Sequence, residues 1–146
     1  MLPLEDALAQ MLNQLPFPTK TETLALTEAA DRVCAEDVIS PINVPSFDNS
    51  AMDGYAVRLA DLQQSMTLSV AGKSFAGNPF QGEWVAQSAV RIMTGAMIPE
   101  GADAVVMQEE VTVNEDGTVT FAALPKANQN IRRIGEDVKK GDVVLH

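Results

Sequence analysis

The hydrophobic pattern of the chain changes its period near Pro41, and this change constrains the fold more than any other feature. After Pro41, short runs of apolar and β-branched residues alternate with turn-forming residues to about residue 138, which predicts strands. Before Pro41, apolar residues recur at the spacing of an amphipathic helix: Leu4, Leu8, Met11, Leu12 and Leu15. We therefore expect a mainly β protein with some α (α+β), in which a β-rich, barrel-like domain accompanies a small helical and β domain.

The first helix is predicted over residues 4–15. Glu5 and Asp6 stand in its first turn, where the positive end of the helix dipole favours acidic side chains. Pro16 and Pro18 are expected to end the helix, because the residue before a proline is disfavoured in the α conformation.

The segment between this helix and Pro41 is predicted to hold a short strand at 23–26 and a brief helix capped by Thr27. Cys34 is expected to be buried on the apolar side of that helix, beside Val33. A single cysteine cannot form an intrachain disulfide, which is typical of a reducing compartment. We therefore expect a cytoplasmic protein.

Strands in the β-rich part are predicted at 68–70, 89–93, 104–113 and 118–121. The pair Asp116-Gly117 favours a tight reversal and predicts a hairpin over 111–121. Short strands at this spacing are typical of a small barrel or sandwich.

Composition excludes several classes of function. With 20 acidic and 10 basic side chains among 146 residues, the formal net charge is −10, which disfavours nucleic-acid binding because phosphate neutralisation needs a basic surface. No apolar run approaches the roughly 18–20 residues needed to span a bilayer, so no membrane role is expected. Motifs for a phosphate-binding Lys loop, a zinc-binding His pair or a Ser/Cys–His nucleophile are also missing.

The first of three polar loops, residues 45–57, holds Asp48, Ser50 and Asp53 before Gly54. Short polar side chains on a loop with glycine suit contact with an anion or a metal–phosphate group, because backbone N–H groups can approach the ligand. The alternative is a pair of local turns in which every polar group is bonded to nearby backbone.

Two further loops carry candidate residues. In 91–106 a predicted strand delivers Thr94 and Gly95 at its end, the usual place for a site, although an ordinary strand connection is the alternative. In 130–137, Arg132 stands near Asp137; an arginine can grip phosphate and a carboxylate can hold a divalent cation. The alternative for this loop is a solvated cluster of mutually compensating charges.

Together these loops resemble the molybdopterin molybdenumtransferase family, which includes MoeA and the gephyrin E-domain. The resemblance covers essentially the whole chain, in the family's order. The motifs that carry it are residues 47–56, 91–96 followed by 99–106, and 130–133 with 135–137.

The resemblance implies a division into domains. Residues 1–43 and 139–146 would form a discontinuous first domain, and residues 44–138 the β-rich second domain inserted into it. Family members continue into an α/β domain that binds the pterin and then a C-terminal β domain. We therefore expect this chain to be an N-terminal part that lacks the main substrate site and is inactive alone.

The activity that the resemblance implies is insertion of molybdenum from molybdate into adenylylated molybdopterin, with a divalent cation, Mg²⁺, and a homodimer whose subunits share each cleft. The resemblance also implies molybdopterin adenylyltransferase as a further partner. Asp53, Thr94 and Asp137 would be catalytic, with Asp53 and Asp137 as metal ligands, and Ser50 and Arg132 would bind the cofactor.

Because a glycine that can turn the chain lies close to Asp53, Thr94 and Asp137, we expect the three to converge on one face of the β-rich domain, exposed and not ion-paired in the core. A non-catalytic interaction or scaffolding module is the alternative. A coding sequence that continues into an α/β domain would favour the enzyme.

Overall fold

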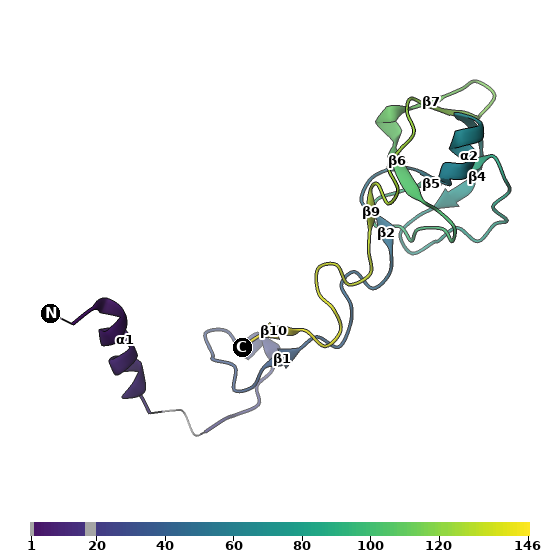
Figure 1. Ribbon diagram of the computed structural model, residues 1–146. Coiled ribbons are helices and arrows are strands. Elements are labelled where there is room, and N and C mark those ends of the chain that lie inside the picture. The colour runs from purple at the N-terminus through teal and green to yellow at the C-terminus, as the bar shows by residue number, and fades with distance from the viewer. Residues whose placement is uncertain (1, 17–19) are drawn as a thin grey trace. The chain divides into compact units, whose positions relative to one another are not determined.

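The computed structural model describes residues 2–16 and 20–146, and its contacts divide the chain into two compact units. The larger unit is Ile39–Val144, and the smaller comprises the residues up to Val38 together with Leu145–His146. The sequence predicted the boundaries at 43/44 and 138/139. The boundaries of the larger unit lie further out because residues 40–45 pair with residues 135–142. These two segments run side by side in Figure 1.

The smaller unit contains the helix α1 (Leu4–Asn13) and a single 3₁₀ turn, η1 (Leu26–Glu28). The helix confirms the predicted periodicity and ends before Pro16, whereas Pro18 lies outside the described residues. None of the described residues of this unit is buried. Among the described residues of the whole chain, no helix has the length and apolar character needed to cross a membrane.

Three predictions for the smaller unit were wrong. Residues 23–26 do not form a strand, the helix expected from Thr27 is only the turn η1, and Cys34 is exposed instead of buried. The local pattern was apolar, but burial requires a covering element, and no other described element of this unit packs over the segment.

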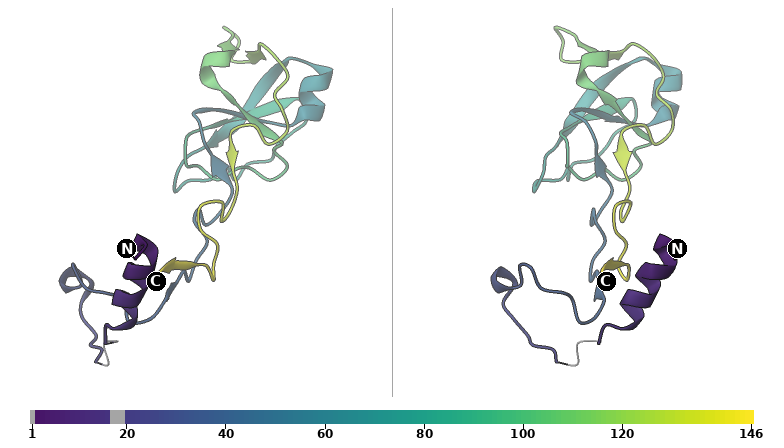
Figure 2. Two further views of the ribbon diagram at one scale, coloured as in Figure 1. Left: turned by 60° about the vertical axis from the view of Figure 1, so that its left-hand side comes forward. Right: turned by 90° about the vertical axis from the view of Figure 1, so that its left-hand side faces the viewer.

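The larger unit is built on a sheet of six strands that confirms the mainly β fold (Figures 1 and 2). All neighbouring pairs are antiparallel except β4–β5, which is parallel. A short helix, α2 (Leu59–Gln64), links β3 to β4. The strands in spatial order are β6 (Ala104–Met107), β3 (Gly54–Val57), β5 (Ser88–Ile92), β4 (Thr67–Ser74), β8 (Val119–Phe121) and β7 (Val111–Val113).

The sheet is curled, and the connection between its edge strands shows why. Strands β6 and β7 lie at opposite ends of the strand order, yet only the 3₁₀ turn η2 (Gln108–Glu110) separates them in sequence. Three residues can join two edges only if the sheet bends to bring them near each other. The single strand predicted at 104–113 was therefore wrong, because η2 interrupts it. The hairpin predicted over 111–121 is confirmed.

The structure contains two further short sheets. Strand β2 (Asn49–Ser50) pairs antiparallel with β9 (Ile131–Arg132), and β1 (Val38–Ile39) pairs with β10 (Val143–Leu145). Between these pairs, the Val44 N–H donates to the Val138 carbonyl at 2.7 Å. The chain segment before the six-stranded sheet and the segment after it thus run side by side and are hydrogen-bonded to each other.

The core occupies both faces of the six-stranded sheet. Because side chains alternate along a strand, Tyr55 and Val57 of β3 enter one apolar cluster while Ala56 enters another. The first cluster includes Leu62 of α2, and the second includes Ile92 of β5. All four residues of β3 are buried, so this strand is enclosed on both faces.

Replacing Gly54 by alanine should destabilise the larger unit by about 3 kcal/mol, because overpacking forces the backbone to move. A Cβ at position 54 would lie 1.9 Å from the Val106 carbonyl oxygen, which is a backbone atom of the paired strand β6. Thermal or urea unfolding measures the loss. Gly82→Ala is the matched control, because its Cβ would lie 3.0 Å from the movable Phe80 ring. Equal losses in both variants would contradict the prediction.

Candidate functional site

The start of β3 and the end of β5 lie at the same end of the sheet. Asp53 immediately precedes β3, and Thr94 follows β5. The two strands are antiparallel, with Gly54 opposite Ile92. Antiparallel pairing therefore brings together two loop residues that are 41 positions apart in sequence.

One carboxylate oxygen of Asp53 is held by two donors from Thr94. The Thr94 backbone N–H donates to Asp53 Oδ1 at 2.8 Å, and the Thr94 hydroxyl donates to the same oxygen at 2.7 Å. These bonds, first the backbone one, and the nearby positive charge of Arg91 lower the pKa of Asp53. No described residue donates to Asp53 Oδ2, so this oxygen can accept a ligand.

Thr94 acts here as a support for Asp53. A hydroxyl has one proton to donate, and the Thr94 hydroxyl gives it to Asp53. In this arrangement Thr94 does not have a side-chain proton left for a phosphate oxygen. The geometry therefore favours a positioning role for Thr94, with Asp53 as the residue that faces a ligand.

A second Asp–Thr pair shows what is distinctive about the first. Asp116 Oδ1 accepts from the Thr118 N–H at 2.9 Å and from the Thr118 hydroxyl at 2.7 Å, which lowers the pKa of Asp116. This pair is local and closes the turn between β7 and β8. The Asp53–Thr94 pair has the same bonds but joins distant loops, so local turn chemistry does not explain it.

Ser50 is placed close to this pair but does not present its side chain. It is fully buried, and its hydroxyl donates to the Met52 carbonyl at 2.6 Å. Its backbone carbonyl accepts the Gly95 N–H at 2.8 Å. Ser50 therefore joins the first polar loop to the loop that carries Thr94, and its hydroxyl faces protein instead of a ligand.

Arg132 and Asp137, two of the predicted site residues, form an ion-paired cluster with Glu136. Arg132 Nη2 lies 2.6 Å from Asp137 Oδ1, and Arg132 Nε lies 2.7 Å from Glu136 Oε1. Hydrogen bonds from Arg132 and from the Arg133 N–H lower the pKa of Glu136, and the bonds to Glu136 and Asp137 raise the pKa of Arg132. The cluster is exposed, with 39% of the Arg132 side chain and 48% of the Asp137 side chain accessible.

The structure thus brings Asp53 and Thr94 together and places Asp137 in a different set of contacts. Among the described residues, no hydrogen bond or ion pair joins the two sets. Ser50 lies between them, since it bonds Gly95 and pairs with Ile131 in β9. Asp137 is solvent-accessible as expected, and its exposed ion pair with Arg132 belongs to the compensating charge cluster that was the alternative for this loop.

The donor set fits a divalent cation only in part. In the described part of the chain, no group of three or more His, Cys, Asp or Glu side chains is arranged to hold a metal ion. Both oxygens of Asp137 accept from Arg132, whereas Oδ2 of Asp53 is open. Because Mg²⁺ often takes one or two carboxylates and fills its other positions with water and substrate phosphates, Asp53 suits it as one ligand of several.

Asp48 and Arg133 form a connection that the sequence did not single out as a pair. The Ile134 N–H donates to Asp48 Oδ1 at 2.8 Å, and Arg133 forms an ion pair with Asp48 Oδ2. These contacts, the backbone bond above all, lower the pKa of Asp48. They hold the first polar loop against the third across 85 residues. No sequence signal marks such a distant pair.

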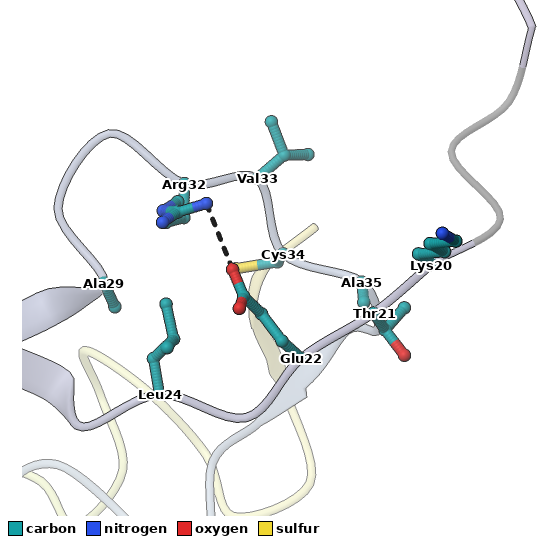
Figure 3. A pocket seen from close by; sticks show the side chains of 9 residues that line it. All are labelled: Lys20, Thr21, Glu22, Leu24, Ala29, Arg32, Val33, Cys34 and Ala35. Atoms are coloured by element: carbon teal, nitrogen blue, oxygen red, sulfur yellow. Dashed lines mark ion pairs between the residues drawn. The ribbon is translucent and has the colours of Figure 1, made fainter.

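A pocket of about 590 Å³ lies in the smaller unit (Figure 3). Its walls include the exposed Cys34 and Val33 and the ion pair between Arg32 and Glu22, whose atoms lie 3.1 Å apart. That ion pair is more than half exposed on both sides, so it contributes little stability. None of the predicted site residues lines the pocket.

The fold and these three loops define a β-rich N-terminal region of a known family. The family model for the MoeA N-terminal region (domain I and II) matches residues 2–146. The chain therefore belongs to the MoeA N-terminal region family.

Relatives of the chain are larger proteins. A molybdopterin molybdenumtransferase from Haemophilus influenzae is 81% identical over 145 residues, which are 99% of this chain and 36% of the relative. One from Bacillus subtilis is 41% identical over 86% of the chain and 31% of the relative. The crystal structure of a molybdopterin biosynthesis MoeA protein from Pyrococcus horikoshii matches all of the chain and 40% of its own, with a TM-score of 0.83 and 38% identity. The chain thus spans about a third of the length of the curated relatives.

Asp48→Asn should lower the free energy of unfolding by about 1 kcal/mol or less at pH 7, since a half-exposed ion pair is screened by solvent. The asparagine keeps an acceptor for the Ile134 N–H but loses the charge that faces Arg133. Because the folded pKa of Asp48 is lowered, this stabilisation is complete above the ordinary pKa of about 3.9 and is lost as the pH falls through the folded pKa. Urea unfolding at several pH values measures it. A difference that grows toward acid pH would contradict the prediction.

Proposed function

We propose that this chain is the N-terminal region of a molybdopterin molybdenumtransferase and forms one wall of the site that inserts molybdenum from molybdate into adenylylated molybdopterin. Two facts support the proposal: the family to which the chain belongs, and the names of its relatives. The observation that assigns this function to particular residues concerns the Asp53 carboxylate. Thr94 donates two hydrogen bonds to one of its oxygens, and the other oxygen stays open.

Asp53 is proposed to bind a divalent cation, Mg²⁺, at the pyrophosphate of the adenylylated pterin. Its lowered pKa keeps the carboxylate ionised at neutral pH, as a metal ligand must be. When bound, such a cation would neutralise phosphate charge and polarise the phosphoryl oxygens. Thr94 fixes the orientation of the carboxylate, so that Oδ2 points away from its support.

Arg132 is proposed to contact the same substrate, and Asp137 is proposed to act on it only by holding Arg132 in place. Arg132 uses Nε for Glu136 and Nη2 for Asp137, while no described residue accepts from its Nη1. A guanidinium held by two carboxylates presents its remaining donors in a fixed direction, which suits a phosphate oxygen. Asp137 then acts as a support for Arg132, in the way that Thr94 supports Asp53.

The remainder of the site is proposed to come from other parts of the enzyme. The relatives are about three times as long as this chain, which leaves room for a pterin-binding domain. A homodimer that shares its clefts, and delivery of the substrate by an adenylyltransferase, are part of the same proposal.

An interaction module is the second candidate, and one observation favours it. The apolar residues of α1 are exposed, with 80% of Leu4, 67% of Met11 and 58% of Leu12 accessible. An exposed apolar stripe on a helix is typical of a surface that packs against another protein segment. Such a role would leave turnover independent of Asp53.

The test is a chimera in which this chain replaces the matched region of the Haemophilus relative. Asp53→Asn should lower the rate of molybdenum-cofactor formation at least about tenfold, a loss typical of disturbed metal sites. The amide oxygen still accepts from Thr94, so the fold should be kept and the melting temperature should stay close to that of the unchanged chimera.

Asp116→Asn is the matched control for this test. It removes the charge from a carboxylate with the same two Thr bonds, on the turn between β7 and β8. Its turnover should equal that of the unchanged chimera. Full activity of Asp53→Asn would refute the enzymatic role of Asp53 and favour the interaction module.

A further inference from the structure

Arg91 makes several contacts around the start of β3, next to Asp53. Its Nη1 donates to the Gly54 carbonyl at 2.7 Å and to the Ile92 carbonyl at 2.8 Å. Its guanidinium carbon lies 5.3 Å from the centroid of the Tyr55 ring, which is a cation–π distance. Arg91 and Tyr55 are also direct partners across the β3–β5 pair.

Gln108, the first residue of η2, completes these contacts. Its side-chain oxygen accepts from Arg91 Nη2, and its backbone N–H donates to the Asp53 carbonyl at 3.0 Å. The carbonyls of Asp53 and Gly54 are therefore both bonded, one by Gln108 and the other by Arg91. The hydrogen bond between the Arg91 and Gln108 side chains links these two contacts, so that together they hold the peptide unit that follows Asp53.

We propose that Arg91, supported by Gln108, is a positioning residue for Asp53: it fixes the start of β3 so that the Asp53 carboxylate meets Thr94 and directs Oδ2 to the substrate. This inference rests on the proposed function, because it assigns to Arg91 an effect on turnover that passes through Asp53. The positive charge of Arg91 also helps to keep the carboxylate ionised.

A purely structural role is the competing explanation, and the chain offers a matched control for it. Arg58 makes the same kinds of contact elsewhere in the larger unit. Its guanidinium carbon lies 4.7 Å from the Trp84 ring centroid, and it donates to the carbonyls of Trp84 and Val85. Arg58 also forms an ion pair with Asp61, with Nε 2.8 Å from Oδ2. Arg58→Met therefore removes a cation–π contact, two carbonyl bonds and this ion pair without touching the start of β3.

The experiment is a double-mutant cycle in the chimera described above. Arg91→Met should lower turnover about ten- to a hundredfold, because small displacements of a reacting group are costly. In the Asp53→Asn background, Arg91→Met should cause no further loss, since its effect passes through Asp53. Arg58→Met should leave turnover close to that of the unchanged chimera.

A second readout needs no turnover and uses the present chain. The Thr94 amide proton, which bonds the Asp53 carboxylate, should shift upfield in the NMR spectrum of Arg91→Met and exchange faster with solvent. The same proton should be unchanged in Arg58→Met. If Arg91→Met fails to fold, Gln108→Leu provides the milder variant, with a smaller loss of turnover that is again absent in the Asp53→Asn background.

The outcomes separate this inference from the proposed function. If Asp53→Asn lowers turnover but Arg91→Met does not, or if the two losses multiply, the positioning role is overturned and the proposed function stands. An unmoved Thr94 amide in Arg91→Met also overturns it. If Asp53→Asn retains full turnover, the proposed role of Asp53 fails, and the positioning role of Arg91 fails with it.

Discussion

Enclosure of β3 on both faces and both edges is the constraint on which the larger unit depends. The strand has β5 on one side and β6 on the other, and each of its four residues is buried. A strand in this position cannot shift its register, because a slip of one residue would exchange the side chains of its two apolar clusters. Gly54 adds a steric limit, since the Val106 carbonyl leaves no room for a side chain. The first residue outside this strand, Asp53, therefore has a well-defined place.

Rigid strands end in polar loops, and the candidate site is formed where these loops meet. Asp53 takes its position from β3 and Thr94 takes its position from β5, so their bonds follow from the strand pairing. Arg91 and Gln108 reinforce the same place from within the sheet. A carboxylate that is held by one oxygen and open at the other is suited to binding, because little freedom is lost when a ligand arrives.

The charges of the third polar loop are locally balanced. The chain carries a net charge of −10, yet the third polar loop pairs Arg132 with Glu136 and Asp137, and Arg133 with Asp48. The Arg133–Asp48 pair holds the loop to the first polar loop, and the pairs within the loop leave few donors of Arg132 for a ligand. Sequence reasoning had offered both a phosphate site and a compensating cluster for this loop. The observed contacts form the compensating cluster. If Arg132 also binds a ligand, it must do so with the donors that its two carboxylate partners leave free.

The sequence by itself determined the class of fold, the helix at residues 4–15 to within its last turn, the hairpin at 111–121 and the family, because these depend on local periodicity, turn chemistry and motifs. Only the tertiary structure decided that Cys34 is exposed, that residues 108–110 interrupt the strand predicted at 104–113, and that Asp137 bonds Arg132 while Asp53 bonds Thr94. The physical reason is that burial and pairing depend on which distant segments meet. Local patterns state that a residue is apolar or charged, but the partner that covers or neutralises it is set by the packing of the whole sheet.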